Sequence, residues 1–342
     1  MNYILSGSLK QKRLTVITFY PTERCNLNCS GCLNAISRNK ILSRNKSDLS
    51  FKTFKKAIDE FGVLKPFLYF SGGEPTLNND IFRMISYTNE KRFITSMVTN
   101  GLTLDEKYQD ILNCGLRFIT ISIDGFEKDH DEMRGMPGAF DKTLNGVKKL
   151  ISSRSDSIHI KVNITINKNN YSYLFNLVKF LFSLGVDEVS LQHFSFFNPE
   201  TIALQEECAK KYALGVEVMG AGINSKSYLS KKQISVLEKE LAKIRRSEFN
   251  VDLNETPVDD IRKYYEGKSP STKSKCRRVN NELGIRANGD VEICPGYVLG
   301  NIRNDRIIDL FRGKKAEHLR NILKRNLIPA CYRCCRLNYS FK

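Results

Sequence analysis

The chain has 342 residues and is strongly basic, with 54 lysines and arginines against 37 aspartates and glutamates and a formal net charge of +17. No apolar stretch reaches the length of roughly eighteen residues that a membrane-spanning helix needs, because the longest, residues 173–186, is short and contains Lys179. The first residues also lack the apolar region and cleavage site of a signal peptide. We therefore expect a cytoplasmic protein, in which ten cysteines stay reduced and indicate metal binding rather than disulfides.

The positive charge is concentrated at the two ends of the chain. Residues 1–50 hold eight basic and two acidic side chains, and residues 312–342 hold nine and one. One interpretation is a solvated basic surface. The other is electrostatic attraction of an anionic partner, such as an acidic peptide, nucleic acid, a phosphorylated small molecule or a membrane surface.

Strand-like and helix-like segments alternate along the first 200 residues. The first strand, residues 15–20, is β-branched and aromatic, and the first helix begins after Ser50, an expected N-cap. Five further strands are expected at residues 67–70, 93–99, 117–123, 158–166 and 187–194. This alternation predicts an α/β fold, a partial (βα)6 TIM-like barrel with parallel strands, whose reactive groups follow the C-terminal strand ends.

After about residue 200 the alternation gives way to helical patterns and then to a cysteine-bearing segment. Capping boxes are expected where helices begin, formed by Thr103 with Glu106 and by Ser230 with Gln233. We expect a core domain at residues 12–200, a helical bridging region at 201–274 that ends in a polar linker, and a small domain at 275–342. The small domain has a predicted hairpin turn at residues 288–289, and bound metal would compensate for its small core.

Three cysteines, Cys25, Cys29 and Cys32, stand close together in the loop after the first strand. An odd number of thiols within eight residues does not make a disulfide framework, so we interpret them as metal ligands. Three thiolates can hold three irons of a 4Fe–4S cluster and leave the fourth iron open to a bidentate ligand. A structural zinc site is the alternative, although zinc takes four protein ligands and usually two Cys-x2-Cys pairs.

The order of three motifs resembles that in the radical S-adenosylmethionine (SAM) superfamily. The motifs are Cys25-x3-Cys29-x2-Cys32, Gly72-Gly73-Glu74-Pro75 after the second strand and Ser122-Ile-Asp124-Gly125 after the fourth. This resemblance, over about residues 12–200, implies that the open iron chelates the amino and carboxylate groups of SAM. It further implies that the reduced cluster cleaves SAM to methionine and a 5′-deoxyadenosyl radical, which abstracts a hydrogen atom from substrate. A reductant protein such as flavodoxin or ferredoxin is then an expected partner.

The resemblance also assigns SAM contacts to the loops that follow the strands. The stretch Gly72, Gly73 and Glu74 would meet the methionyl amino group, and its glycines permit close backbone approach. Ser122 and Asp124 match positions that bind the ribose or carboxylate of SAM. Arg134 matches an arginine that pairs with the SAM carboxylate, and an ordinary surface arginine is the alternative.

Two polar residues in otherwise apolar strands, Asn163 and Gln192, are further candidates for substrate or adenine contacts, or else hydrogen-bonded core groups. Gly31 departs from the family pattern, because most members carry an aromatic residue just before the third cysteine. Adenine must then pack against another group, and Tyr20 and Phe194 are available, although either could be an ordinary core aromatic.

A second cysteine set lies in the C-terminal segment. Its members are Cys276, Cys294, Cys331 and Cys334, with Gly289 and Gly300 between them. This pattern resembles the auxiliary-cluster domain called SPASM, in its shorter Twitch form, and implies one auxiliary 4Fe–4S cluster. A four-thiolate zinc site is the alternative, and Cys335 is either a spare thiol or a replacement ligand for Cys334.

Two cysteines remain outside these sets. Cys114 is expected to be a small buried hydrophobe at a helix end. Cys208, on an expected helix after the sixth strand, is a candidate for the thiol that returns a hydrogen atom in some radical epimerases.

These features predict a radical SAM oxidoreductase or maturase whose auxiliary cluster accepts an electron from the substrate radical. We expect an oxidative modification, either a dehydrogenation or a cross-link, of a peptide or an amino-sugar or cyclitol substrate. The basic ends suit an anionic substrate, such as a peptide with an acidic leader or a phosphorylated or sugar-like small molecule. Alternatives are a radical epimerase, a lipid-modifying radical SAM enzyme and, from another class, a zinc-containing nucleic-acid-binding protein, although nucleic acid is not the expected partner.

Overall fold

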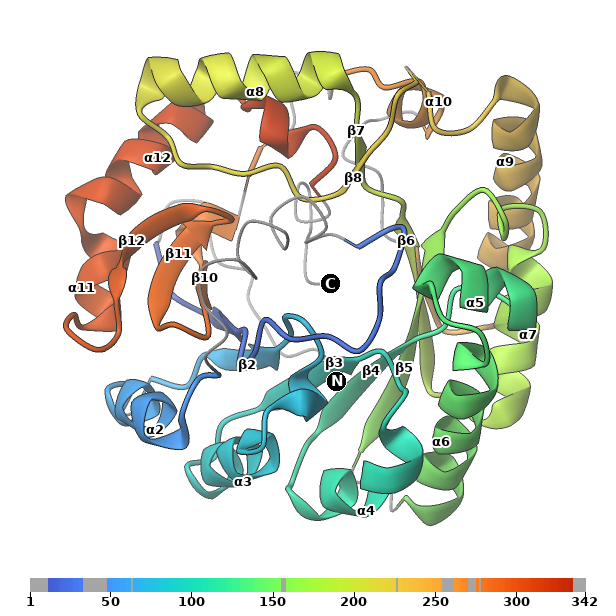
Figure 1. Ribbon diagram of the computed structural model, residues 1–342, viewed down its shortest axis with the longest axis horizontal. Coiled ribbons are helices and arrows are strands. Elements are labelled where there is room, and N and C mark those ends of the chain that lie inside the picture. The colour runs from blue at the N-terminus through green and yellow to red at the C-terminus, as the bar shows by residue number, and fades with distance from the viewer. Residues whose placement is uncertain are drawn as a thin grey trace.

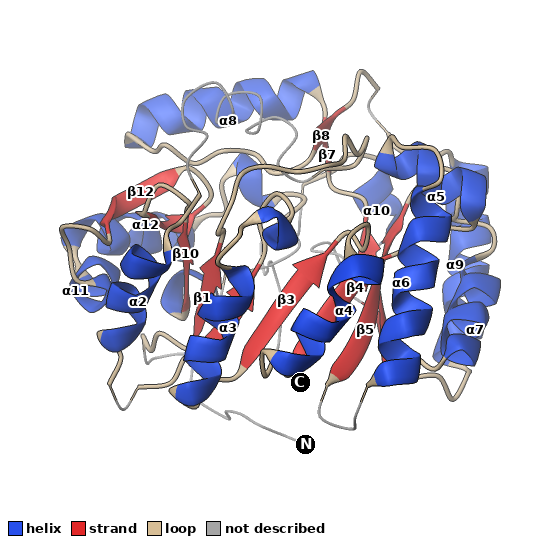
Figure 2. Ribbon diagram, turned by 60° about the horizontal axis from the view of Figure 1, so that its bottom comes forward, coloured by secondary structure: helices blue, strands red, loops and turns tan. Residues whose placement is uncertain are grey.

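A curved sheet forms the centre of the molecule, and helices cover its outer face (Figure 1). The computed structural model describes residues 12–32, 48–62, 64–154, 158–225, 227–253, 261–269, 275–276 and 278–334. Its ten-stranded sheet has the order β12-β11-β10-β1-β2-β3-β4-β5-β6-β9. The strands line the inside of the molecule, and the helices lie outside them (Figure 2).

The first half of the chain forms the expected (βα)6 arrangement, in which neighbouring strands are parallel. The strands are β1 (Val16–Phe19), β2 (Phe67–Phe70), β3 (Thr95–Thr99), β4 (Phe118–Ser122), β5 (His159–Ile166) and β6 (Glu188–His193). The helices are α2 (Phe51–Asp59), α3 (Ile81–Glu90), α4 (Leu104–Asn113), α5 (Glu127–Arg134), α6 (Ala139–Ser153) and α7 (Leu174–Leu184). All six strands fall where hydrophobic patterning predicted them, whereas α5 was not predicted.

The rest of the chain extends both edges of this sheet. Strand β9 (Val251–Leu253) pairs in parallel with β6, and β10 (Glu282–Ile285) pairs in parallel with β1. The predicted hairpin around residues 288–289 joins β10 to the antiparallel strand β11 (Asp290–Cys294). Strand β12 (Tyr297–Asn301), which was not predicted, pairs antiparallel with β11 at the edge of the sheet. The C-terminal segment is therefore joined to the core by sheet hydrogen bonds.

In the described ranges, the remaining elements are a small second sheet, five α-helices and short 3-10 helices at Pro75–Leu77, Arg278–Asn280 and Pro329–Cys331. The sheet pairs β7 (Phe196–Phe197) with β8 (Ala221–Gly222). The helices are α8 (Pro199–Tyr212), α9 (Lys231–Arg245), α10 (Ile261–Tyr265), α11 (Ile307–Arg312) and α12 (Lys314–Arg325). Part of the expected polar linker, residues 270–274, and Cys335 lie outside the described residues.

Strand β5 illustrates why the inside of the sheet is polar while its outside is the core. Successive side chains of a strand point to opposite faces. The outward set, Ile160, Val162, Ile164 and Ile166, is fully buried under the helices. The alternate set, His159, Lys161, Asn163 and Thr165, is half-buried and lines the lumen of the barrel.

Local signals at the helix starts are confirmed in two cases and wrong in one. The Ser50 side chain accepts a hydrogen bond from the backbone of Thr53, as expected for an N-cap, and the capping box of Ser230 with Gln233 is present. Thr103 makes no such capping bond. Its hydroxyl instead hydrogen-bonds the Thr76 hydroxyl at 2.7 Å, a contact between separate loops that sequence spacing does not reveal.

Aromatic packing holds α2 against the sheet. Phe54 of α2 is fully buried, and its ring lies 4.8 Å from that of Phe19 in β1 and 5.8 Å from that of Phe70 in β2.

Among the residues that the structure describes, no helix combines the length and apolar character needed to cross a membrane.

Replacing Phe54 with alanine removes this packing and leaves a cavity between helix and sheet. We expect the free energy of unfolding to fall by about 3–5 kcal/mol. Urea unfolding followed by circular dichroism measures the change. Leu64→Ala, at a side chain that is 48% exposed, is the control and should change stability by less than about 0.5 kcal/mol. An equal effect of both substitutions would contradict this account of the core.

Candidate active site

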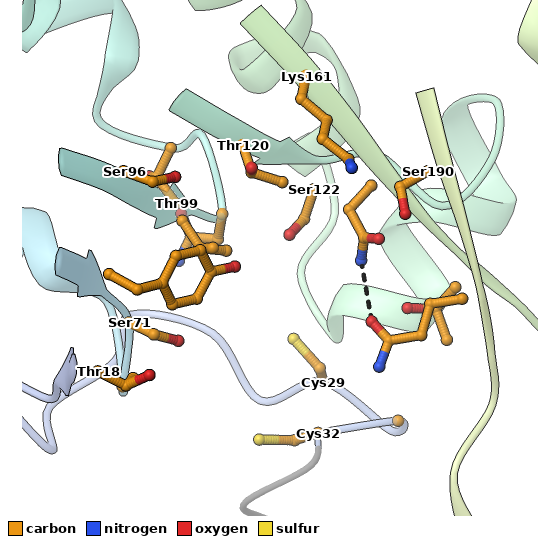
Figure 3. A pocket seen from close by; sticks show the side chains of 18 of the residues that line it. Thr18, Cys29, Cys32, Ser71, Ser96, Thr99, Thr120, Ser122, Lys161 and Ser190 are labelled. Carbon is orange, nitrogen blue, oxygen red and sulfur yellow. Dashed lines mark hydrogen bonds between the residues drawn. The ribbon is translucent and has the colours of Figure 1, made fainter. Parts of the chain in front are cut away.

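The lumen of the barrel contains a cavity of about 480 Å³ that both cysteine sets reach. Cys25, Cys29 and Cys32 line it from the loop after β1, and Cys334 lines it from the C-terminal segment. In Figure 3, Cys29 and Cys32 face the cavity across from Ser122 of β4, Lys161 of β5 and other lumen side chains. A volume of this order is typical of small-molecule sites.

The two glycines after β2 let this loop pack against the cysteine loop. A Cβ atom at Gly73 would lie 1.9 Å from the carbonyl oxygen of Arg24, and one at Gly72 would lie 2.9 Å from that of Thr22. The Gly73 N–H donates to Thr22 O at 3.1 Å, and the next N–H donates to Arg24 O at 2.7 Å. The glycines therefore fix the backbone directly before Cys25 as well as lining the cavity.

Glu74 joins the β2 loop to the β3 loop. Its carboxylate is buried and accepts four hydrogen bonds, from the backbone and hydroxyl of Thr76, the hydroxyl of Thr99 and the backbone of Asn100, at 2.7–3.2 Å. Burial raises the pKa of Glu74, while these hydrogen bonds lower it. These four hydrogen bonds fix the Glu74 carboxylate between the β2 and β3 loops and so give this residue a positioning role.

Asn100 is a site residue that the sequence analysis did not assign. Its amide nitrogen donates to Asn26 Oδ1 at 2.7 Å and lies 3.9 Å from the Cys25 sulfur. Thr143 holds its backbone carbonyl with a hydrogen bond of 3.2 Å. The only signal in the sequence was an Asn-Gly pair at a strand end, which is equally typical of an ordinary turn.

Asp124 and Arg134 form a buried ion pair beside the cysteine loop. The Asp124 carboxylate is fully buried, lies 2.7 Å from Arg134 Nη2 and accepts the backbone N–H of Thr165 at 2.8 Å. Arg134 Nη1 lies 3.9 Å from the Cys29 sulfur. Arg134 is therefore not a surface arginine, and Asp124 orients it.

His130 completes this group. It accepts the backbone N–H of Asp124 at 3.1 Å through Nδ1. Burial and the neighbouring Arg134 lower the pKa of His130 to about 4, so the ring is neutral near pH 7. Because His130 is neutral, Arg134 is the source of positive charge beside Cys29 among the described residues.

The other predicted cofactor contacts lie on the lumen wall. Ser122 ends β4 and is buried, and Asn163 and Gln192 extend into the lumen from β5 and β6, where Asn163 Nδ2 donates to Gln192 Oε1 at 3.4 Å. Below them Lys161 Nζ is 2.6 Å from Glu188 Oε1. The structure thus brings together all the residues predicted to contact SAM, and their contacts with SAM itself stay predictions.

The side chains around Gly31 leave no room for a Cβ atom at this position. A Cβ there would lie 2.3 Å from the Met133 methyl carbon and 2.6 Å from the Phe194 ring. Phe194 in turn stacks on Tyr228 with ring centroids 4.1 Å apart and planes 2° from parallel. Phe194 therefore lies beside the third cysteine, whereas Tyr20 lines the cavity near β10 with the Arg286 guanidinium 4.7 Å from its ring.

The four C-terminal cysteines lie near enough to one another to interact electrostatically. Burial raises the pKa of Cys331 well above the usual range, and the neighbouring thiols of Cys276, Cys294 and Cys334 raise it further. Mutually destabilised thiolates of this kind are the ones that a bound metal centre deprotonates. No group of three His, Cys, Asp or Glu side chains within the described ranges is arranged to hold a single metal ion, whereas each thiolate of a 4Fe–4S cluster bonds a different iron.

Two other cysteines lie away from the cavity. Cys114 is buried at the end of α4, donates to Ile111 O at 3.3 Å and has its pKa raised to about 11 by burial, as expected of a small core residue. Cys208 lies on α8 and is absent from the cavity lining. Its position does not support the hydrogen-donor role considered from the sequence.

Gly73→Ala tests whether close backbone packing positions the first cysteine set. The added methyl group would displace the Arg24 carbonyl, so we expect the first cluster to be lost while about four irons remain at the second. Iron analysis after anaerobic reconstitution measures this. Gly222→Ala is the matched control, because its Cβ would meet nothing within 4 Å. Full iron content in Gly73→Ala would contradict the proposed role of this contact.

Two family models match the chain at the two cysteine sets. The radical SAM superfamily matches residues 19–181, and the iron–sulfur cluster-binding domain SPASM matches residues 276–335. These matches decide against the zinc-containing alternative. They fit a SAM-bound 4Fe–4S cluster, SAM and an auxiliary iron–sulfur cluster as the cofactors, in agreement with the converging thiols.

Known proteins resemble the chain over different lengths. Fe-coproporphyrin III synthase of Methanosarcina barkeri is 33% identical over 157 residues, which cover 45% of this chain and 38% of that protein. The tungsten-containing aldehyde ferredoxin oxidoreductase cofactor-modifying protein of Pyrococcus furiosus is 24% identical over 341 residues, which cover 92% of this chain and 85% of that protein. The chain thus aligns with less than half the length of the first relative.

The fold is shared with SuiB of Streptococcus suis. Its crystal structure superposes with a TM-score of 0.66 and 17% sequence identity, covering 91% of this chain and 68% of that one. The likeness spans the barrel and the C-terminal segment. The chain belongs to the radical SAM superfamily and carries a C-terminal SPASM domain.

Proposed function

We propose that this enzyme reductively cleaves SAM at the first cysteine set and abstracts a hydrogen atom from a hydrophilic substrate held in the lumen, with net oxidation of that substrate. The observation that carries the proposal is that residues of both cysteine sets line the same cavity. A substrate in this cavity lies between the source of the radical and an acceptor for the remaining electron.

The residues of the first site have distinct roles in this proposal. Cys25, Cys29 and Cys32 would hold a cluster that, when bound, supplies the electron for SAM cleavage to the 5′-deoxyadenosyl radical. Arg134, oriented by Asp124, binds the SAM carboxylate as a charge-assisted pair. Gly73 and Glu74 hold the β2 loop against the cysteine loop, and Ser122 faces the ribose.

Cys276, Cys294, Cys331 and Cys334 would hold the auxiliary cluster, which would supply an acceptor for an electron from the substrate. Loss of a hydrogen atom and then of an electron and a proton is a two-electron oxidation, which fits a dehydrogenation or a cross-link. A reductant protein such as flavodoxin or ferredoxin supplies the first electron. Such reductants work in the cytoplasm, where we place the enzyme.

The lumen lining favours a hydrophilic substrate. Hydroxyl groups of Thr18, Ser71, Ser96, Thr120 and Ser190 lie around the cavity (Figure 3). Such a wall suits the hydroxyl, amino and amide groups of a peptide side chain, an amino sugar or a cyclitol. It suits less well the Fe-coproporphyrin III named for the Methanosarcina relative, whose alignment covers 45% of this chain.

The iron content of reconstituted protein tests the two-cluster assignment. We expect about eight irons per chain, and about four in the Cys276→Ala/Cys294→Ala variant, because each 4Fe–4S cluster holds four. Colorimetric iron and sulfide analysis measures both. About four irons in the parent protein would remove the auxiliary cluster from this account.

SAM cleavage tests the proposed reaction. Protein reduced anaerobically with SAM should release 5′-deoxyadenosine, which liquid chromatography with mass spectrometry detects. Cys29→Ala should lower this release by at least about a thousandfold, because the ligand set of the cluster is broken. Cys208→Ala, a cysteine outside the cavity lining, is the control and should retain it. No 5′-deoxyadenosine from parent protein with full iron content would refute the proposal.

A further inference from the structure

Arg333 is a buried cation in the wall of the cavity. It lies between the auxiliary-cluster residues Cys331 and Cys334, lines the cavity and is only 3% exposed. The hydroxyl of Ser195, which follows β6, fixes its backbone carbonyl at 3.2 Å. The barrel therefore holds the backbone of Arg333 in place.

The contacts of Arg333 with the part of the chain that the structure describes leave its charge without an anionic partner. Nη1 donates to the carbonyl oxygens of Lys268 at 2.9 Å and Tyr332 at 2.7 Å, and the guanidinium carbon lies 5.0 Å from the Phe196 ring centroid and 4.8 Å from that of Tyr264. Within the described residues, Arg333 Nε has no hydrogen-bond partner and no carboxylate forms an ion pair with this side chain.

The other cations of the cavity wall do have carboxylate partners. Arg134 pairs with Asp124 at 2.7 Å and Lys161 with Glu188 at 2.6 Å. On the auxiliary-cluster side, Arg278 Nη2 lies 3.2 Å from Glu282 Oε1. Arg333 is the most deeply buried of these four cations, yet it has no carboxylate partner among the described residues. An unpaired buried charge is costly, so buried cations are normally paired with an anion.

The auxiliary cluster itself is one possible anion, but Arg278 is better placed to compensate its charge. Arg278 is buried, follows the cluster residue Cys276 by two positions and lines the same cavity as Cys334. The guanidinium of Arg333 instead lies over the rings of Phe196 in β7 and Tyr264 in α10. Arg333 is thus left for a ligand in the cavity.

We infer that Arg333 binds a carboxylate or phosphate group of the substrate at the auxiliary-cluster side of the cavity. The inference rests on the proposed function, because it places the substrate between the two cysteine sets. An anion held there would orient the rest of the substrate toward the SAM site. A planar guanidinium suits either oxyanion, since both accept paired hydrogen bonds.

Nuclear relaxation of small anions tests this site in the reconstituted enzyme without SAM, because reduction of the SAM-bound enzyme would start SAM cleavage. The probes are inorganic phosphate, observed by 31P, and succinate, observed through its methylene protons. An anion at Arg333 lies next to the auxiliary cluster, so reduction of the clusters to their paramagnetic state should accelerate the relaxation of a bound probe. Phosphate and succinate together distinguish which oxyanion the site prefers.

We expect reduction-dependent relaxation with at least one probe in the parent enzyme, weakened about tenfold or more in Arg333→Gln, since a hydrogen bond to a charged group is lost. Arg333→Lys should retain part of the effect. Arg154→Gln, which removes a cation outside the cavity lining that pairs with Asp187, should retain all of it. Iron content verifies that each variant holds both clusters.

The outcomes separate this inference from the proposed function. Parent enzyme that cleaves SAM but relaxes neither probe, or equal relaxation in Arg333→Gln, would overturn the inference and leave the proposed function intact. A shift in the auxiliary-cluster potential of Arg333→Gln without any effect on anion binding would identify Arg333 as a counter-ion of the cluster, and would also overturn it. Anion binding in an enzyme that never cleaves SAM would overturn the proposed function alone.

Discussion

The pairing of β10 with β1 is the interaction on which the arrangement of the site depends. These strands are more than 260 residues apart in the chain, yet they lie in parallel register, with Val16 opposite Glu282 and Phe19 opposite Ile285. The hydroxyl of Thr18 donates to the Glu282 carboxylate at 3.0 Å, which adds a side-chain contact to the backbone pairing. Strand β1 leads into the first cysteine loop, and β10 leads into β11, which ends at Cys294. This pairing therefore brings both cysteine sets to one cavity.

A second set of contacts holds the first cysteine loop from three directions. The loop after β2 meets it through Gly73, the loop after β3 through Asn100, and α5 through Arg134. Two of these groups bring N–H donors near cysteine sulfurs, and such donors tune the reduction potential of an iron–sulfur cluster. The same contacts that position the ligands therefore also affect their electronic properties.

The sequence was sufficient to predict the barrel and both cysteine sets. Each βα unit combines a short apolar strand with an amphipathic helix, so the two periodicities could be read locally, as for residues 158–166. The cysteine spacings and the Gly-Gly-Glu-Pro motif are likewise confined to short segments, so they too could be recognised from the sequence alone. The three residues of β9 and the polar helix α5 lack a sufficient pattern and were not predicted.

The contacts that organise the site were less accessible from the sequence. Glu74 accepts hydrogen bonds from residues 25 and 26 positions later, and Arg134 reaches a sulfur 105 positions earlier. Gly31 illustrates the same limit, because the reason for its small size is the methyl of Met133 and the ring of Phe194. Only the folded chain brings these groups together, and the unpaired charge of Arg333 likewise depends on which residues surround it.

The central claim is that one cavity serves a cluster that binds SAM and a second cluster that does not. Electron paramagnetic resonance of the reduced, reconstituted protein, recorded with and without SAM, tests this most directly. We predict two overlapping cluster signals, of which SAM changes only one, and the changed signal should be absent from Cys29→Ala. A spectrum in which SAM alters neither signal, or alters the signal that remains in Cys29→Ala, would contradict the account.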